Sequence, residues 1–326
     1  MQTLRARFTP LLGVAAAVVF VVAVASCNGC SAGPEPTDPA ATDLATGDGA
    51  ASQDTMGIDG AGSDGAGSDG AADAGVVADA GPPRAKVYLH DPLTDQGTTT
   101  EVNLVAPTSK DGSLVGPYAD VKNCLNEVGG EKIRRQGFDV GAFCLEKHTA
   151  LPGADGSYLA IEPPADTADP NDAFAEVQMY HHMHAVHAYF KDNFGLADLD
   201  YPFDALVNIN LYIDPTVAKL IGVPPGWQGF ANAAFVPKEG FAAFKLPARE
   251  QGAIIFGQYG KTDLSYDASV IYHEYTHAMI GTTRLASILP DVYGLDHLPG
   301  AMNEGFADYF AATMTNHPVI GTYGIG

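Results

Sequence analysis

His273 and His277 lie four residues apart in the segment His-Glu-Tyr-Thr-His, which has the residue types of a metal site. Residues four apart share one face of an α-helix, so both imidazoles can point at one ion. Catalytic zinc characteristically takes three protein ligands and leaves one open position, and two histidines with one carboxylate form a common set. Glu274, between the histidines, is placed to act as general base for the attacking water.

A second segment, Asn-Glu-Gly-Phe-Ala-Asp at residues 303–308, supplies the missing carboxylate. Glu304 follows His277 by 27 residues, and Asp308 lies one helical turn beyond Glu304. A ligating histidine usually donates its other ring N–H to a carboxylate or a carbonyl group. We therefore predict that Glu304 is the third zinc ligand and that Asp308 orients His273.

Together the two segments resemble the gluzincin metallopeptidases of the thermolysin and fungalysin group, in which two histidines and a downstream glutamate bind zinc. The resemblance implies one catalytic Zn²⁺ and a polypeptide substrate. Residues 232–240 are similar to a fungalysin segment whose Asn-Ala edge strand holds the substrate backbone, which predicts substrate contacts for Asn232 and Ala233. Residues 174–194 resemble the long helix of the family, although Ala188 stands where the family usually has Asp.

The expected reaction is peptide-bond hydrolysis, in which Glu274 takes a proton from water and passes it to the leaving amine. Tyr293, in the loop before the ligand helix, is a candidate donor to the developing oxyanion. Enzymes of the group continue into a helical lobe that forms the other wall of the cleft, whereas 18 residues follow Asp308 here. The sequence is therefore expected to be either a fragment or a reduced form that lacks this C-terminal lobe.

Two functions stay open at this point. The first is an exported zinc endopeptidase. The second is a surface-tethered, zincin-like module that is catalytically weak or inactive and holds peptides in an open groove.

A second group of histidines, His181, His182, His184 and His187, lies in a helix expected over residues 172–193. Pairs three residues apart could bind a metal, but no carboxylate or cysteine is spaced to complete the set. Aromatic neighbours favour packing. We predict that these histidines are solvent-facing or satisfied core residues.

The N-terminus, residues 1–27, is typical of an export signal. Arg5 and Arg7 precede an apolar run at residues 11–25 that is short for a membrane span. The tetrapeptide that ends at Cys27 resembles the lipobox of bacterial lipoproteins, which predicts a lipid on Cys27. An ordinary secretory peptide is the alternative. Both interpretations export the protein, either to the cell envelope or to the medium.

Residues 28–84 contain Gly, Ala, Ser, Pro, Thr and Asp and few aliphatic residues, which predicts a disordered tether. This segment has ten acidic residues against one basic residue, Arg84, within a chain of net charge −22. Such acidity argues against a nucleic-acid partner. We expect a monomer that contacts a membrane only through its lipid.

Cys124 and Cys144 are the cysteines of the expected folded part. An exported protein meets an oxidising compartment, so a disulfide is predicted, worth about 3 kcal/mol in the loop-entropy model.

The folded part is expected to comprise a β-rich region over residues 85–170 and a catalytic domain over residues 171–326. Strands are predicted at residues 86–89, 101–105, 158–161, 205–213 and 253–258, the fourth of them half-buried. Helices are predicted at residues 172–193, 267–281 and 301–314. Asn171 or Asp172 is the expected cap of the first helix, which should close near Gly195, and Asp267 is the expected cap of the second. Strands and helices without regular alternation indicate an α+β zincin-like domain.

Overall fold

The structure is a computed structural model that describes residues 81–127, 132–135, 138–167, 169–244, 249–283, 285 and 298–325. The predicted export signal with Cys27, the tether up to residue 80, and Tyr293 lie outside the described residues.

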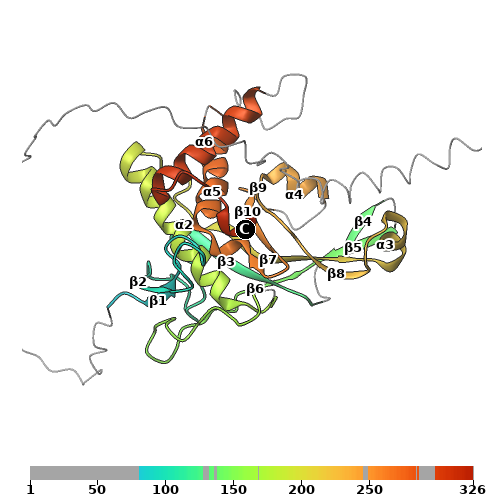
Figure 1. Ribbon diagram of the computed structural model, residues 1–326, viewed down its shortest axis with the longest axis horizontal. Coiled ribbons are helices and arrows are strands. Elements are labelled where there is room, and N and C mark those ends of the chain that lie inside the picture. The colour runs from blue at the N-terminus through green and yellow to red at the C-terminus, as the bar shows by residue number, and fades with distance from the viewer. Residues whose placement is uncertain are drawn as a thin grey trace, which may run out of the picture. The chain divides into compact units, whose positions relative to one another are not determined.

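A nine-stranded sheet forms the centre of the fold (Figure 1). Its longest strand, β7 (Phe203–Ile213), runs parallel to β3 (Ala119–Leu125) on one side and to β10 (Ala253–Tyr259) on the other. Three short strands pair antiparallel at its margins: β6 (Leu145–Lys147) with β3, and both β9 (Ala233–Val236) and β11 (Thr262–Asp263) with β10. Strands from both sides of residue 170 therefore belong to one sheet.

The second half of β7 leaves these neighbours and pairs antiparallel with β5 (Phe138–Phe143) and β8 (Gly226–Gly229). β4 (Lys132–Arg135) pairs with β5, and the short helix α3 (Pro215–Ile221) follows β7. These elements form the arm at the right of Figure 1.

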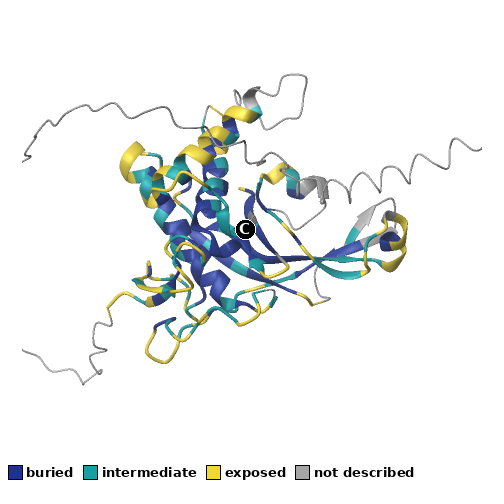
Figure 2. Ribbon diagram, viewed as in Figure 1, coloured by how far each residue is buried: buried dark blue, intermediate teal, exposed yellow. Residues whose placement is uncertain are grey.

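The strand at β7 is confirmed, but its predicted half-burial is wrong, because residues 205–210 are all buried. Figure 2 shows the same dark centre of the sheet. Asn208 has a left-handed φ of 58°, and the pairing with β10 slips by one residue there. Such a bulge moves later side chains to the opposite face. Leu206 and Val207 alternate as successive strand residues do, so Val207 packs in the main core and Leu206 packs in a second cluster with Phe230. The bulge adds Ile209 to this second cluster, and apolar side chains therefore cover both faces.

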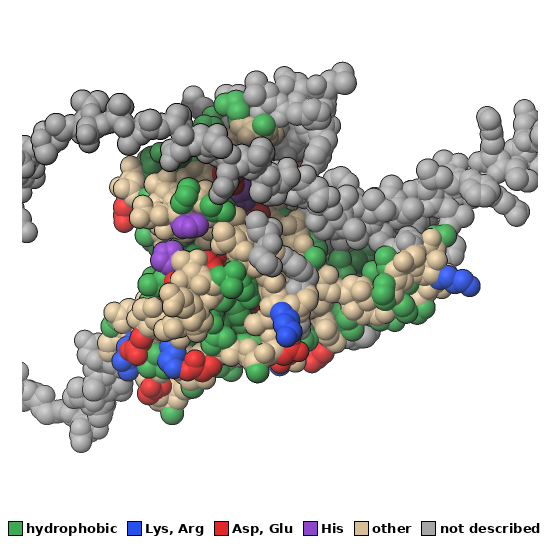
Figure 3. All heavy atoms as spheres, viewed as in Figure 1, with side chains coloured by type: hydrophobic (Ala, Val, Ile, Leu, Met, Phe, Trp, Pro, Cys, Tyr) green, Lys and Arg blue, Asp and Glu red, His purple; other side chains and the backbone are tan. Residues whose placement is uncertain are grey.

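The predicted strands before residue 170 have mixed outcomes. β1 (Arg84–Val87) and β2 (Thr100–Asn103) form an antiparallel pair close to the expected positions. In Figure 3, blue and red side chains lie next to each other over this hairpin, where Arg84 pairs with Glu101 at 2.6 Å. The predicted strand at residues 158–161 is wrong: Tyr158 is buried in a turn, where its hydroxyl donates to the Gly112 carbonyl group.

The helix α2 (Ala173–Phe194) is confirmed together with both of its ends. Asp172 accepts hydrogen bonds from the amides of Phe174 and Ala175, and Gly195 closes the helix with a φ of 67°. Glycine adopts this left-handed conformation without the steric cost of a Cβ atom. α2 packs across β3 and β7 and against α5.

Two further helices carry the predicted zinc segments. α5 (Ala268–Thr282) begins after Asp267, whose Oδ1 accepts from the amides of Ser269 and Val270, as predicted. α6 (Leu298–Thr315) starts three residues earlier than expected and lies beside α5 (Figure 1). Shorter helices are α4 (Lys238–Phe244), α7 (Thr322–Ile325) and the 3₁₀ turn η2 (Leu264–Tyr266). In the described part of the chain, no helix combines the length and apolarity that crossing a membrane requires.

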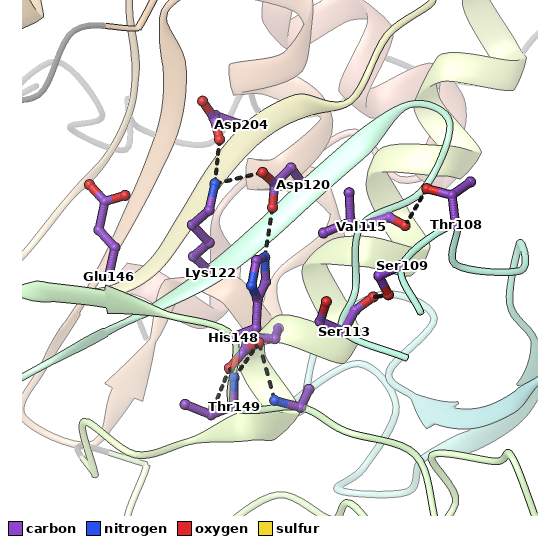
Figure 4. A network of polar contacts seen from close by, with 12 residues as sticks. Thr108, Ser109, Ser113, Val115, Asp120, Lys122, Glu146, His148, Thr149 and Asp204 are labelled. Carbon is purple, nitrogen blue, oxygen red and sulfur yellow. Dashed lines mark hydrogen bonds and ion pairs between the residues drawn. The ribbon is translucent and has the colours of Figure 1, made fainter. Parts of the chain in front are cut away.

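The predicted disulfide between Cys124 and Cys144 is present, with Cα atoms 5.2 Å apart. Nearby, a network of charges ties the strands together (Figure 4). Lys122 on β3 contacts Asp120 at 2.6 Å and Asp204 on β7 at 2.8 Å, and His148 contacts Asp120 at 2.8 Å. These charges are partly buried, so each is more stable with its partner than it would be alone.

Candidate active site

Helix α5 positions the two histidines and the glutamate of the first segment. His273 and His277 lie one turn apart, and their side chains are 16% and 13% exposed. Glu274 is more deeply buried, at 9%. The rigid backbone of a capped, core-packed helix therefore sets the relative positions of all three side chains.

Helix α6 places Glu304 opposite this pair. The Oε2 atom of Glu304 lies 3.2 Å from Nε2 of His273 and 3.4 Å from Nε2 of His277, and the two Nε2 atoms are 3.0 Å apart. Ligand atoms at about 2.0–2.1 Å from a tetrahedral zinc ion lie roughly 3.3 Å from one another. The donor set, two imidazole nitrogens and one carboxylate oxygen, and its spacing both fit a zinc ion.

Each histidine is held through its other ring nitrogen. Nδ1 of His273 lies 2.9 Å from Oδ1 of Asp308, and Nδ1 of His277 lies 2.8 Å from Oδ1 of Asn303. Because both partners accept, each Nδ1 carries a hydrogen, and each Nε2 faces Glu304, where it could bind a metal once its own proton has left. The Asp308 contact is the one that the sequence suggested.

Asn303 was missed, although it directly precedes Glu304 in the segment that drew attention to α6. It is 7% exposed, so its amide is a fixed part of the site. Its position could have identified it, because Asn303 lies next to the ligand Glu304 on the same helix. The sequence assigns an acceptor to His273 but none to His277.

The charges around the histidines change their titration. Burial alone would lower the pKa of His273, but hydrogen bonds to Asp308 and Glu304 outweigh it and raise the pKa to about 10. The pKa of His277 is raised as well, because Glu304 and Glu274 outweigh its burial. Hydrogen bonds from both histidines lower the pKa of Glu304. The site is thus negative enough to favour a cation between these side chains.

Glu274 is linked to the edge strand β9. Its Oε2 atom accepts a hydrogen bond of 2.7 Å from the backbone N–H of Phe235. On the other side of the strand, the Asn232 carbonyl group accepts from Gly257 on β10, at 3.0 Å. The side of β9 that faces away from β10 is therefore turned toward Glu274.

The remaining predicted residues are placed as follows. Asn232 directly precedes β9 and is partly exposed, and Ala233, the first residue of β9, is 6% exposed. The structure therefore places Ala233 on the strand that contacts Glu274, and Asn232 directly before it. Tyr293 lies outside the described residues.

The histidines of α2 are separate from this site. His182 is a satisfied core residue, as predicted, because its ring nitrogens contact the Tyr272 hydroxyl at 2.7 Å and the Tyr88 carbonyl group at 2.9 Å. Over the ranges that the structure describes, His273, His277 and Glu304 form the only group of three or more His, Cys, Asp or Glu side chains whose ligand atoms lie close enough together to hold a metal.

Comparison with known proteins agrees with this geometry. The family model of the fungalysin metallopeptidases (M36) matches residues 44–325, most of the chain. Among curated proteins, no significant match was found. The chain therefore belongs to the fungalysin metallopeptidases, a family of zinc-dependent hydrolases that act on polypeptides and are typically secreted.

Proposed function

We propose that this protein is an exported zinc endopeptidase that binds one Zn²⁺ through His273, His277 and Glu304. The observation that carries the proposal is the convergence of three ligand atoms from α5 and α6 beside the buried carboxylate of Glu274. Asp308 and Asn303 hold the two imidazoles in the orientation that a ligand requires.

In the proposed reaction, zinc supplies Lewis-acid activation of the attacking water and of the peptide carbonyl group. Glu274 takes a proton from the water as the new C–O bond forms. The same carboxylate then gives the proton to the amine nitrogen as the C–N bond breaks. The N–H of Phe235 holds one oxygen of Glu274, which fixes the orientation of the carboxylate while its other oxygen exchanges protons.

A substrate strand is expected to lie along β9. Backbone groups of successive strand residues point to opposite edges. Since Asn232 bonds to β10 and Phe235 faces Glu274, the N–H and C=O groups of Ala233 point to the same side as those of Phe235. An extended peptide that pairs with Ala233 would pass beside the general base, an example of strand addition to a sheet edge. Asn232 is proposed to contact the same peptide.

Export follows from the N-terminal segment, and we propose that Cys27 carries a lipid that anchors a monomeric enzyme in the cell envelope. Support comes from the residues that precede Cys27 and from the secretion that is typical of the family. Labelling with a radioactive fatty acid tests the anchor: Cys27→Ser should abolish the label, whereas Cys30→Ser should keep it.

The central test is the variant Glu274→Gln in the full-length chain. Cleavage of an unfolded protein should fall by about 10²–10⁴-fold, because the general base is lost, while bound zinc stays at about one ion per chain. Glu250→Gln, at an exposed carboxylate, is the matched control and should cleave normally. A peptide blocked at both ends should be cut internally by the unaltered enzyme.

Two outcomes would contradict the proposal. Unchanged cleavage in Glu274→Gln would remove Glu274 from the base role. Zinc binding without cleavage by the unaltered chain would instead favour a peptide-binding module.

A further inference from the structure

A small cavity with room for about one water molecule lies at the start of the zinc helix α5. Three segments meet there: the loop after β1, the first turn of α5, and the chain that follows α6. The cavity is lined by side chains that carry carboxylate or hydroxyl oxygens: Asp91, Thr94, Asp267, Ser269, Thr315 and Thr322.

Asp267 uses only one of its two carboxylate oxygens. Oδ1 accepts from the amide of Ser269 at 2.9 Å, from the hydroxyl of Ser269 at 2.6 Å and from the amide of Val270 at 3.4 Å. Oδ2 is buried without a hydrogen-bond partner, in a residue that is 1% exposed. Because Oδ1 is turned to the helix amides, Oδ2 is the oxygen left for the cavity.

Asp91 brings a second buried carboxylate to the same wall, at 4% exposure. It already accepts from the amides of Leu93 and Thr94 and from the Thr94 hydroxyl, at 2.6–3.0 Å. Burial first, and then the nearby charge of Asp91, raises the pKa of Asp267. Two acids thus meet at one small space, where the charge of Asp91 makes the ionised form of Asp267 less favourable.

No lysine or arginine is among the described residues that line the cavity. Two histidines do line it, but each uses its Nδ1 elsewhere. His90 contacts Asp95 at 3.0 Å, and His317 contacts the Val319 carbonyl group at 2.9 Å. An unpartnered buried carboxylate oxygen is costly, and such an oxygen is commonly satisfied by an ordered water or an ion.

We infer that this cavity is a binding site for a calcium-type cation, with Asp91 and Asp267 as its carboxylate ligands. Oxygen donors, two of them charged, are the ligands that hard cations take. Mg²⁺ usually keeps several of its waters, for which a space of this size has no room. Ca²⁺ accepts flexible coordination directly by protein oxygens, which suits walls made of carboxylates and hydroxyls.

A cation here would join three segments that are already in contact. The His90 carbonyl group accepts from the amide of Ala268 at 2.7 Å, and the Ser269 hydroxyl accepts from the amide of Gly321 at 3.0 Å. The first turn of α5 would be clamped between its neighbours, one and a half turns before His273. The site is separate from the zinc ligands, so the inference does not depend on the proposed peptidase activity.

The test uses the full-length, zinc-loaded chain that carries Glu274→Gln, so that it does not digest itself. At a fixed concentration of free zinc, CaCl₂ should raise the midpoint of thermal unfolding. The expected rise is about 3–6 °C when calcium is about tenfold above its Kd. MgCl₂ at the same concentration should produce a clearly smaller rise.

Asp267→Asn on that background keeps an amide oxygen able to cap the helix but removes a charged ligand. Calcium should then bind about tenfold more weakly or worse, as ligand charge sets affinity in such sites, and most of the rise should be lost. Asp172→Asn is the matched control, since Asp172 is also a buried N-cap aspartate. It should lower the midpoint itself but keep the full response to calcium.

Asp91→Asn provides a second variant in case Asp267→Asn does not fold, and it should also lose the response. The inference is overturned if calcium does not raise the unfolding midpoint of the chain that carries Glu274→Gln alone. It is also overturned if Asp267→Asn and Asp91→Asn both respond to calcium as strongly as the Asp172→Asn control. An equal response to MgCl₂ would overturn the choice of a calcium-type ion.

Discussion

Helices α2 and α5 pack against each other, and each carries histidines three or four residues apart. On α5, the imidazoles of His273 and His277 face carboxylate and amide oxygens of α6. On α2, His182 faces a tyrosine hydroxyl and a backbone carbonyl group, and His184 contacts the carbonyl group of Tyr180 at 2.8 Å. The same side chain at the same kind of spacing therefore has two different surroundings.

These surroundings shift titration in opposite directions. The pKa of His273 is raised to about 10 by its acidic partners. Burial lowers the pKa of His182 to about 3 and that of His184 to about 4. Histidines spaced along one helix can therefore form a metal site only if the neighbouring element places suitable residues opposite them. α6 places acidic and amide side chains opposite the histidines of α5.

The comparison is tested most strongly by removing one histidine from each helix. His277→Ala should lose zinc and activity, with an affinity loss larger than the 10–100-fold that is typical for outer hydrogen-bond partners. His184→Ala should keep about one zinc ion per chain and most of its activity, although it unfolds more easily because a cavity remains. Zinc is measured by elemental analysis after dialysis.

Equal zinc loss in the two variants would show that α2 takes part in the metal site, which would remove the contrast between the helices. A far-UV circular dichroism spectrum of each variant excludes global unfolding as the cause of zinc loss.

The outer partners of the α5 histidines should have smaller effects. Asp308→Ala and Asn303→Ala should each weaken zinc binding by about 10–100-fold, because one imidazole loses the acceptor that fixes its tautomer. Competition with a chromogenic chelator measures the affinity. Glu239→Gln, on α4, is the control for removing an acid on the surface, and zinc affinity that is as high in the two variants as in this control would contradict the role of Asp308 and Asn303.

The smallest effect concerns how the free energy of unfolding of the zinc-free protein depends on pH. His182 and His184 have folded pKa values below the ordinary 6.5. Above pH 6.5 neither residue takes up a proton in either state, so their contribution is complete. As the pH falls below 6.5, the unfolded chain gains protons that the folded chain refuses. The free energy of unfolding should fall by about 1.4 kcal/mol per pH unit for each histidine until the folded pKa is reached.

His273 should behave in the opposite way, because its folded pKa is raised. Its contribution is complete below pH 6.5 and is lost as the pH rises toward 10. Urea unfolding at several pH values, with a chelator present, measures both trends. Below pH 6.5, His182→Phe should reduce the fall in the free energy of unfolding per pH unit. Tyr272→Phe, which removes only the hydroxyl partner of His182, should leave that fall unchanged. A fall that is the same in both variants would contradict the assignment to His182.

Much of the local structure could be predicted from the sequence. The caps at Asp172, Gly195 and Asp267 follow from short-range hydrogen bonding and from the freedom of glycine at positive φ. The strand at residues 205–213 was predictable, but its burial was not. The bulge at Asn208 arises in the pairing with β10, and the side chains that cover both faces of the strand come from distant parts of the chain. The apolar residues at 158–161 predicted a strand incorrectly, because a contact distant in the chain also decides their structure. Tyr158 is buried in a turn, where its hydroxyl donates to the Gly112 carbonyl group.

The sequence by itself determined which residues could bind zinc, because helical periodicity puts His273 and His277 on one face and Glu304 and Asp308 on another. Tertiary structure alone decided that these two faces meet, that Asn303 holds His277, and that Glu274 is fixed by the Phe235 amide of an edge strand. The physical reason is range. Periodicity and capping act within a few residues, whereas the partners of a buried polar group are chosen by packing between elements far apart in the chain.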